Sequence, residues 1–235
     1  MKNNTKLATN VALQEKIKQV IIDRGLKSGD LMPTENELID LLEVSRSSLR
    51  EAIKSLEALH ILDIKHGVGT FVGEASLIPM VRGLTFYAQL NLKRDSKTVL
   101  DILDIREILE YGFAPMVLTQ ITQKDIALLH SLLANMENNA KQKQFSLEDE
   151  HQIHLTLYAP LKNQLLTQYL DAFWQIYQSL EENLPPNLIT PEQLAIQHRE
   201  LIDAVELRDL ARMQQAILVY FRKIRQRLTQ GEVNE

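Results

Sequence analysis

Two amphipathic helical segments follow each other with almost no chain between them, and this pair limits the fold of the N-terminal region more than any other feature. Thr34 precedes the stretch ENELIDLLEV, and Glu37 completes the S/T-x-x-E pattern of a capping box. Ser45 can cap a second helix, which leaves only Glu43 and Val44 for the junction. So short a junction predicts a helix-turn-helix.

The segments on either side complete a winged helix-turn-helix. Residues 11–24 place apolar side chains at helical spacing, and Gly25 is a plausible stop. After the second helix of the pair, ILDIK-HGVG-TFV has the pattern of two short strands around a glycine-bearing turn. Between the first helix and the pair, LKSGDLMP has the pattern of a turn with a short extended piece. The predicted order is therefore helix, short strand, helix, helix and hairpin.

The second helix of the pair lies within VSRSSLREAIKSLEAL and has an apolar face beside a basic row. At 100° per residue, four apolar side chains fall within an arc of about 100°, which predicts a buried face. These are Leu49, Ala52, Ile53 and Leu56. Arg46, Arg50 and Lys54 form the basic row at i, i+4 and i+8. Such a row can simply solvate a helix, but the neighbouring helix and hairpin favour contact with DNA.

The 235 residues are comfortable for two domains, and the second one has a different composition. Six of the fifteen Gly and Pro residues fall in the first 73 positions, whereas the rest is glycine-poor and helical in pattern. We expect a mainly α protein, with a winged helix-turn-helix at residues 1–73, a linker at 74–82 and an all-α helical bundle at 83–235. The absence of cysteine, of a signal-peptide pattern and of a long apolar run predicts a soluble cytoplasmic protein with no membrane segment.

Residues 25–72 resemble the DNA-binding domain of the GntR family of bacterial transcription regulators. The resemblance runs through GLKSGDLMPTENEL, VSRSSLREAIKSL and HGVGTFV. It implies that Arg46 and Arg50 contact bases of double-stranded operator DNA. It also implies contacts to phosphates or bases from the helix N-terminus, by Ser45, Ser47 and Ser48.

The resemblance further implies that His66 and Gly67 at the wing tip reach the minor groove. The same two residues suit a plain hairpin turn, because Gly accepts positive φ and His tolerates it; both roles can hold together. Asn36 stands where many members carry Arg, so a DNA contact is lost or replaced there and the operator differs.

The C-terminal segment contains residue types that bind metals. Glu150 and His154 are four positions apart on one predicted helix and project from one face, and His198 lies in another helix. By themselves, such residues are more often structural or exposed. There is no H-E-x-x-H, nucleophile elbow or glycine-rich phosphate loop, so we do not expect an enzyme.

Residues 83–230 resemble the FCD ligand-binding domain of the FadR subfamily, through DIREILE, EHQIH, APLKNQLL and HRELIDAV. Metal-binding members have an acidic residue four before a His, a second His, and a third 22 residues later. Glu150, His154 and His198 match, whereas the last position is Tyr220, a poor ligand at neutral pH. Either these three bind a divalent ion such as Zn, Ni or Mn, with water or an effector completing the shell, or an organic effector contacts them directly.

Three residues are candidates for contact with a carboxylate effector. Arg106 can bind a carboxylate, although an ion pair with Glu110 one turn away is an equal alternative. Asn163 can line the pocket or cap a helix. Tyr220 is the third. Together these features predict a homodimeric transcription regulator that responds to a small organic acid. We expect it to act as a repressor of a metabolic operon. The alternative is a DNA-binding protein with a purely structural dimerisation domain.

Overall fold

A computed structural model describes residues 2–74, 76–92 and 96–230, with side chains from residue 10 onward. The chain divides into two compact units, unit 1 (Met1–Pro79) and unit 2 (Met80–Glu235), which are described separately. The division falls inside the segment predicted as a linker, residues 74–82. Residue 75 of that segment lies outside the described residues, and its last five residues are helical.

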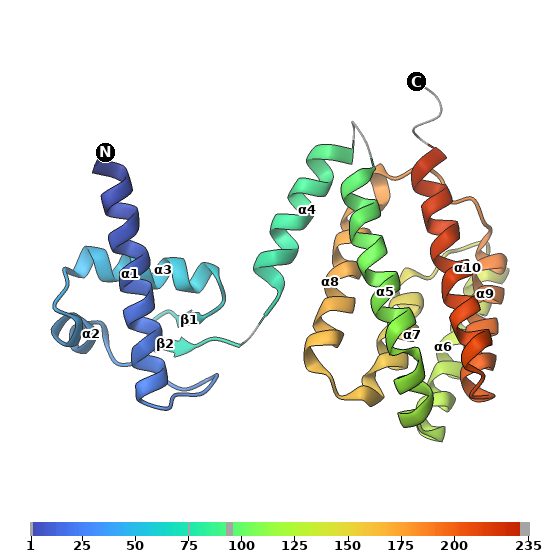
Figure 1. Cartoon of the computed structure of the whole chain (residues 1–235), viewed down its shortest axis with the longest axis horizontal. Helices are drawn as coiled ribbons and strands as arrows, with labels where there is room; N and C mark the ends of the chain where they lie inside the picture. Colours follow the sequence, from blue (N-terminus) through green and yellow to red (C-terminus); the bar gives the residue numbers. More distant parts are fainter. Residues whose placement is uncertain (1, 75, 93–95, 231–235) are drawn as a thin grey trace. The chain divides into compact units, whose positions relative to one another are not determined.

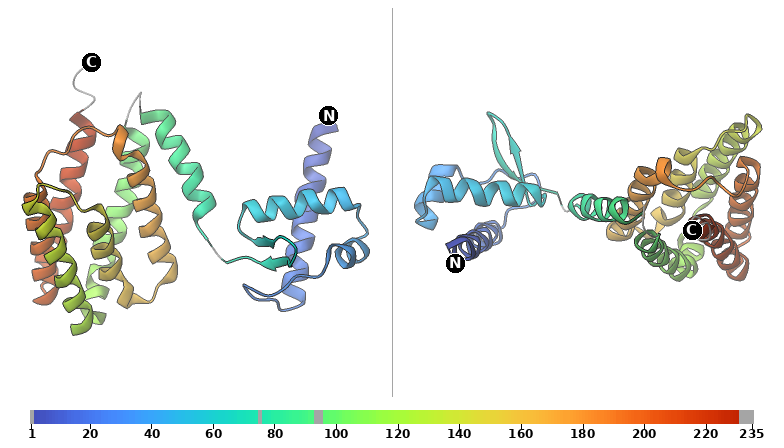
Figure 2. Two further views of the ribbon diagram at one scale, coloured as in Figure 1. Left: turned by 180° about the vertical axis from the view of Figure 1, so that it is seen from behind. Right: turned by 90° about the horizontal axis from the view of Figure 1, so that it is seen from above.

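Unit 1 has three helices and one hairpin in its described part (Figure 1). The elements are α1 (Lys2–Asp23), α2 (Glu35–Leu42), α3 (Arg46–Ala58), β1 (Leu62–Lys65) and β2 (Gly69–Val72). The two strands pair antiparallel, with Leu62 opposite Val72 and Lys65 opposite Gly69. The hairpin projects beside the helices (Figure 2, right). The predicted winged helix-turn-helix is confirmed, although α1 begins nine residues earlier than the predicted 11. The short strand predicted after the first helix is reduced to a single antiparallel bridge between Leu31 and Phe71.

Local hydrogen bonds fix the helix-turn-helix. The Thr34 backbone N–H donates to the Glu37 carboxylate at 2.7 Å, and the Glu37 N–H donates back to the Thr34 hydroxyl at 3.3 Å. Glu43 ends α2 in the left-handed region, with φ of 53°, so the chain reverses within two residues. The predicted apolar face of α3 is buried in the core of unit 1, as Leu49, Ala52, Ile53 and Leu56.

Unit 2 is a bundle of helices that run alongside one another (Figures 1 and 2). The helices are α4 (Ile78–Leu92, which starts two residues before the unit), α5 (Lys97–Gln120), α6 (Gln123–Lys141), α7 (Leu147–Tyr158), α8 (Gln164–Leu180), α9 (Pro191–Glu206) and α10 (Leu210–Thr229). Two 3-10 turns, Ala159–Leu161 and Glu181–Asn183, follow α7 and α8. The predicted all-α bundle is therefore confirmed.

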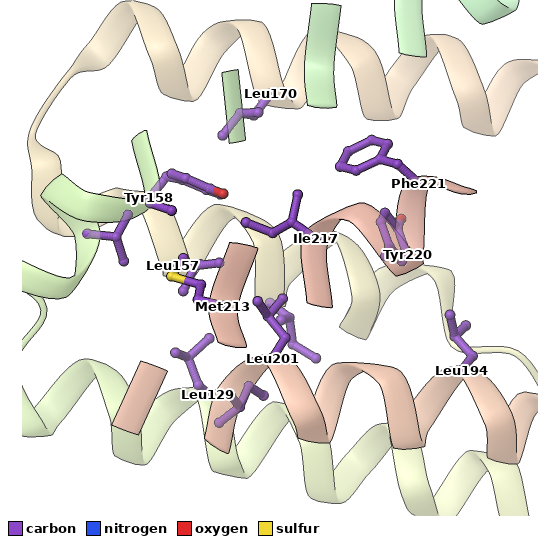
Figure 3. Packing of buried hydrophobic residues seen from close by; sticks show 14 of the residues in the cluster. Leu129, Leu157, Tyr158, Leu170, Leu194, Leu201, Met213, Ile217, Tyr220 and Phe221 are labelled. Carbon is purple, nitrogen blue, oxygen red and sulfur yellow. The ribbon is translucent and has the colours of Figure 1, made fainter. Parts of the chain in front are cut away.

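The core of the bundle lies where α6, α7, α9 and α10 meet (Figure 3). Leu129, Leu157, Leu201 and Ile217 are each at most 4% exposed there, and each comes from a different helix. Within the part of the chain that the structure describes, no helix is long and apolar enough to cross a membrane.

Candidate DNA-binding face and ligand site

The first turns of α3 present two arginines at the surface of unit 1. The side chains of Arg46 and Arg50 are 57% and 58% exposed. Arg46 Nη2 donates to Asn36 Oδ1 at 2.8 Å, and Arg50 Nε donates to both carboxylate oxygens of Glu35 at 3.0 and 3.1 Å. Both partners belong to α2, so the first helix of the pair orients the arginines of the second. Sequence reasoning missed these roles of Glu35 and Asn36.

The N-terminus of α3 adds hydroxyl and backbone donors to the same face. Ser45 accepts a hydrogen bond from the Ser48 N–H at 3.1 Å and so caps the helix. Its hydroxyl also lies 3.0 Å from that of Ser47 and 2.9 Å from that of Ser48. A capped helix N-terminus with clustered hydroxyls suits phosphate contacts.

The wing tip is exposed and tightly turned. His66 and Gly67 both lie at the surface between β1 and β2. Gly67 has φ of 75°, which favours glycine. His66 and Gly67 therefore form the hairpin turn, and their contact with the minor groove stays a prediction.

Unit 2 contains a buried ionic network on α5 and α7. Arg106 Nε donates to Glu110 Oε1 at 2.6 Å, and His154 Nδ1 lies 2.8 Å from Glu110 Oε2. Tyr158 donates its hydroxyl to the Glu110 backbone carbonyl at 2.9 Å. Burial opposes ionisation of Glu110, but His154 and the Arg106 guanidinium beside it hold its pKa down to about 2. Of the two alternatives for Arg106, the ion pair is present.

A second part of the network joins α7, α9 and α10. Tyr220 donates its hydroxyl to Glu150 Oε1 at 2.8 Å, and His198 Nδ1 lies 2.9 Å from the Leu194 carbonyl of its own helix. The rings of His154, His198 and Tyr220 lie 5.0–5.5 Å apart, centroid to centroid. Burial raises the pKa of Glu150 and lowers that of His198 to about 4. The two parts together form one polar cluster inside the bundle.

The hydrogen bonds at Nδ1 determine which nitrogen of each imidazole carries the proton and which has a lone pair. A carbonyl oxygen only accepts, so His198 carries its proton on Nδ1 and a lone pair on Nε2. His154 faces an ionised carboxylate and burial lowers its pKa, which gives the same tautomer. Among the described residues, four buried atoms of this cluster have no hydrogen-bond partner. They are the Nε2 atoms of His154 and His198, Arg106 Nη2 and Trp174 Nε1.

The predicted metal ligands lie in this cluster and have some features of a metal site. The two Nε2 lone pairs are available, and a carboxylate partner at the Nδ1 of His154 is typical of metal-bound histidine. Glu150, however, accepts from Tyr220. The described part of the chain contains no group of three or more His, Cys, Asp or Glu side chains placed to hold a metal ion. The residues present therefore do not fit a three-ligand metal site.

A small cavity adjoins the cluster. It has a volume of about 40 Å³, room for roughly two or three water molecules, and its wall includes Glu150, Gln197, Tyr220 and Lys223. Tyr220 belongs both to this wall and to the aromatic contacts of the two histidines, which places the histidines one side chain away from the cavity. Asn163 lies outside this group: it is exposed and caps α8 by accepting from the Leu166 N–H at 3.1 Å.

Sequence reasoning missed several members of the cluster. Trp174 of α8 lies under the Arg106 guanidinium, with its ring centroid 4.8 Å from Cζ. Arg227 pairs with Glu181 at 2.8 Å and donates to the Tyr177 hydroxyl at 2.7 Å beside the cavity. The i, i+4 spacings of Arg106 with Glu110 and of Glu150 with His154 were usable signals, whereas the contacts of Trp174 and Arg227 join helices far apart in the sequence.

The comparisons with known proteins agree with both units. Residues 9–72 match the family described as bacterial regulatory proteins, gntR family, and residues 101–223 match the FCD domain. The chain is 24% identical over 204 residues to the HTH-type transcriptional regulator LutR of Bacillus subtilis (strain 168), covering 85% of this chain and 91% of that protein. It is 29% identical over 204 residues to the Glc operon transcriptional activator of Escherichia coli (strain K12), covering 81% and 77%.

Solved structures show the same fold. The structure titled Streptococcus agalactiae GntR superposes with a TM-score of 0.56 at 23% identity, over 92% of this chain and 99% of that one. E. coli McbR/YncC gives 0.52 at 16% identity, over 97% and 98%. The chain therefore belongs to the GntR family of bacterial transcription regulators, with an FCD domain as its C-terminal half, and it is a DNA-binding regulator and not an enzyme.

Proposed function

We propose that the protein represses a metabolic operon in the cytoplasm and that a small organic acid bound in unit 2 changes its affinity for operator DNA. Four buried polar atoms in unit 2 have no hydrogen-bond partner among the described residues, and they support this proposal. Burying such an atom costs free energy unless a ligand or a water molecule forms a hydrogen bond with it. Tyr220, whose ring contacts both histidine rings, also lines a cavity, and this supports a ligand near them. The family's relatives include regulators named for the Glc and Uxu operons.

A panel of carboxylic acids tests the regulatory part of this proposal. We expect at least one acid to change the affinity of the full-length protein for a duplex selected from genomic fragments. His198→Ala removes one free imidazole and leaves unit 1 unchanged, so this variant should bind the duplex normally and lose the response. Fluorescence anisotropy of labelled duplex measures both. A wild-type affinity that no acid changes would instead support a purely structural C-terminal domain.

We also propose that the protein acts as a homodimer through the exposed face of α5. Ile105, Ile108 and Met116 are 53%, 70% and 47% exposed on that face. Apart from its two chain neighbours and the nearby backbone of α5 itself, no described atom lies within 4 Å of a Cβ built on Gly112, so the packing of unit 2 does not require glycine there. Glycine inside a helix costs about 1 kcal/mol relative to alanine, and close approach of another helix is a reason to keep it.

The spacing on α5 favours a second copy as the partner. A two-fold axis near Gly112 that relates antiparallel α5 helices sets Ile108 against Met116 of the second copy, because each lies four residues from the glycine. The surface is then self-complementary, as a symmetric dimer requires. The two copies of unit 1 in such a dimer would bind the two halves of a pseudo-palindromic operator.

Ile108→Arg should weaken the dimer at least about tenfold, because the symmetric contact would bury an unpaired charge twice. Leu128→Arg is the matched control, since Leu128 is 51% exposed on α6 of the same unit. Sedimentation equilibrium of the full-length variants gives both dissociation constants. Equal dissociation constants for the two variants and the wild type would remove α5 from the interface.

A further inference from the structure

The tyrosine at position 220 changes what the cluster in unit 2 can bind. Its hydroxyl donates to Glu150 and thereby links α10 to α7 through a direct hydrogen bond. Glu150 is 5% exposed and Tyr220 6%, so the bond is shielded from water. The bond engages one of the two carboxylate oxygens of Glu150, and burial raises the pKa of Tyr220, so position 220 carries a neutral phenol, which is a poor ligand for a divalent ion.

The two imidazoles nevertheless need donors. Both Nε2 atoms bear lone pairs, and His154 and His198 are each 1% exposed, so bulk water does not reach them. A ligand group that carries a hydrogen, such as a hydroxyl, satisfies a lone pair of this kind without a metal. In the same cluster, Arg106 Nη2 and Trp174 Nε1 are donors without partners among the described residues, and they suit a carboxylate.

We propose that unit 2 binds a hydroxycarboxylate without a metal ion. Its carboxylate accepts from Arg106 and Trp174, and its hydroxyl donates to His154 or His198. Tyr220 joins α10 to Glu150 of α7 by a hydrogen bond and supplies no imidazole for a metal ion. This inference rests on the proposed function only in taking unit 2 to be a ligand-binding domain.

The metal part is tested by calorimetry of the full-length protein with Zn²⁺, Ni²⁺ or Mn²⁺ alone. Tyr220→His frees Glu150 and adds an imidazole, so we expect it to bind at least one of these ions about tenfold or more tightly than the wild type does. Tyr87→His is the control, because Tyr87 is 59% exposed on α4. Stoichiometric binding by the wild type as tight as by Tyr220→His would overturn the proposal, and the wild-type titration decides this even if Tyr220→His does not fold.

The ligand part compares acids that differ only in the hydroxyl, with a chelator present. Glycolate should bind at least about tenfold more tightly than acetate, and lactate than propionate, because the acid without the hydroxyl leaves a buried acceptor unsatisfied. Equal binding within each pair, or binding only after a metal is added, would overturn the proposal. Glycolate binding without any change in operator affinity would refute the regulatory function and still support the site.

Discussion

Glu110→Ala is expected to lower the free energy of unfolding of unit 2 by about 3–5 kcal/mol, because it leaves the Arg106 charge buried without its partner. Glu110 is fully buried and Arg106 is 3% exposed, so water cannot replace the lost carboxylate. His154 loses its Nδ1 partner in the same substitution. Urea unfolding followed by the fluorescence of Trp174, the one tryptophan of the chain, reports on unit 2 directly.

Asp101→Ala is the matched control for this substitution. Asp101 also pairs with a cation four residues away on α5, at 3.0 Å from Lys97, but both side chains are exposed. An exposed pair contributes at most about 1 kcal/mol, so this control should unfold almost like the wild type. If Glu110→Ala cost no more than Asp101→Ala, the buried pair would not hold the bundle together.

Arg46→Ala and Arg50→Ala should each weaken binding to the selected operator duplex by about 1–3 kcal/mol, because each removes a side chain expected to contact base edges. Binding to unrelated duplex of equal length should change much less. Both arginines are already oriented by Glu35 and Asn36, so little ordering is needed on binding. Anisotropy titrations at one fixed salt concentration measure the difference.

Lys124→Ala controls for the loss of one positive charge, since Lys124 is exposed on α6 of unit 2. It should bind the operator with wild-type affinity. If the two arginine variants also kept wild-type affinity, the exposed face of α3 would not be the operator-binding surface.

The fold of unit 1 could be predicted almost completely because the sequence patterns that indicate it are local. The capping box at Thr34, the two-residue junction and the apolar arc of α3 each depend on residues within a few positions of one another. The contacts between its helices could not be predicted in this way. The hydrogen bond from Arg46 to Asn36, for example, joins two helices and residues ten positions apart.

The candidate ligand site could be predicted only in part, for the same reason. The sequence placed Glu150, His154 and His198 as candidates, and the structure brings the two imidazoles to 5.5 Å, centroid to centroid. The hydrogen bond from Tyr220 to Glu150 joins residues 70 positions apart. No local sequence pattern predicts that the Tyr220 hydroxyl donates to this carboxylate. Trp174 was missed because an aromatic residue at helical spacing is typical of any bundle core.

The affinity of the full-length protein for its selected operator duplex, measured with and without a saturating acid found by calorimetry, tests the central claim most directly. The account predicts a change of about fivefold or more in the wild type, the usual size of coupling between two sites, and no change in His198→Ala. Identical operator affinity in both states, with the acid shown to be bound, would contradict the claim that unit 2 controls DNA binding.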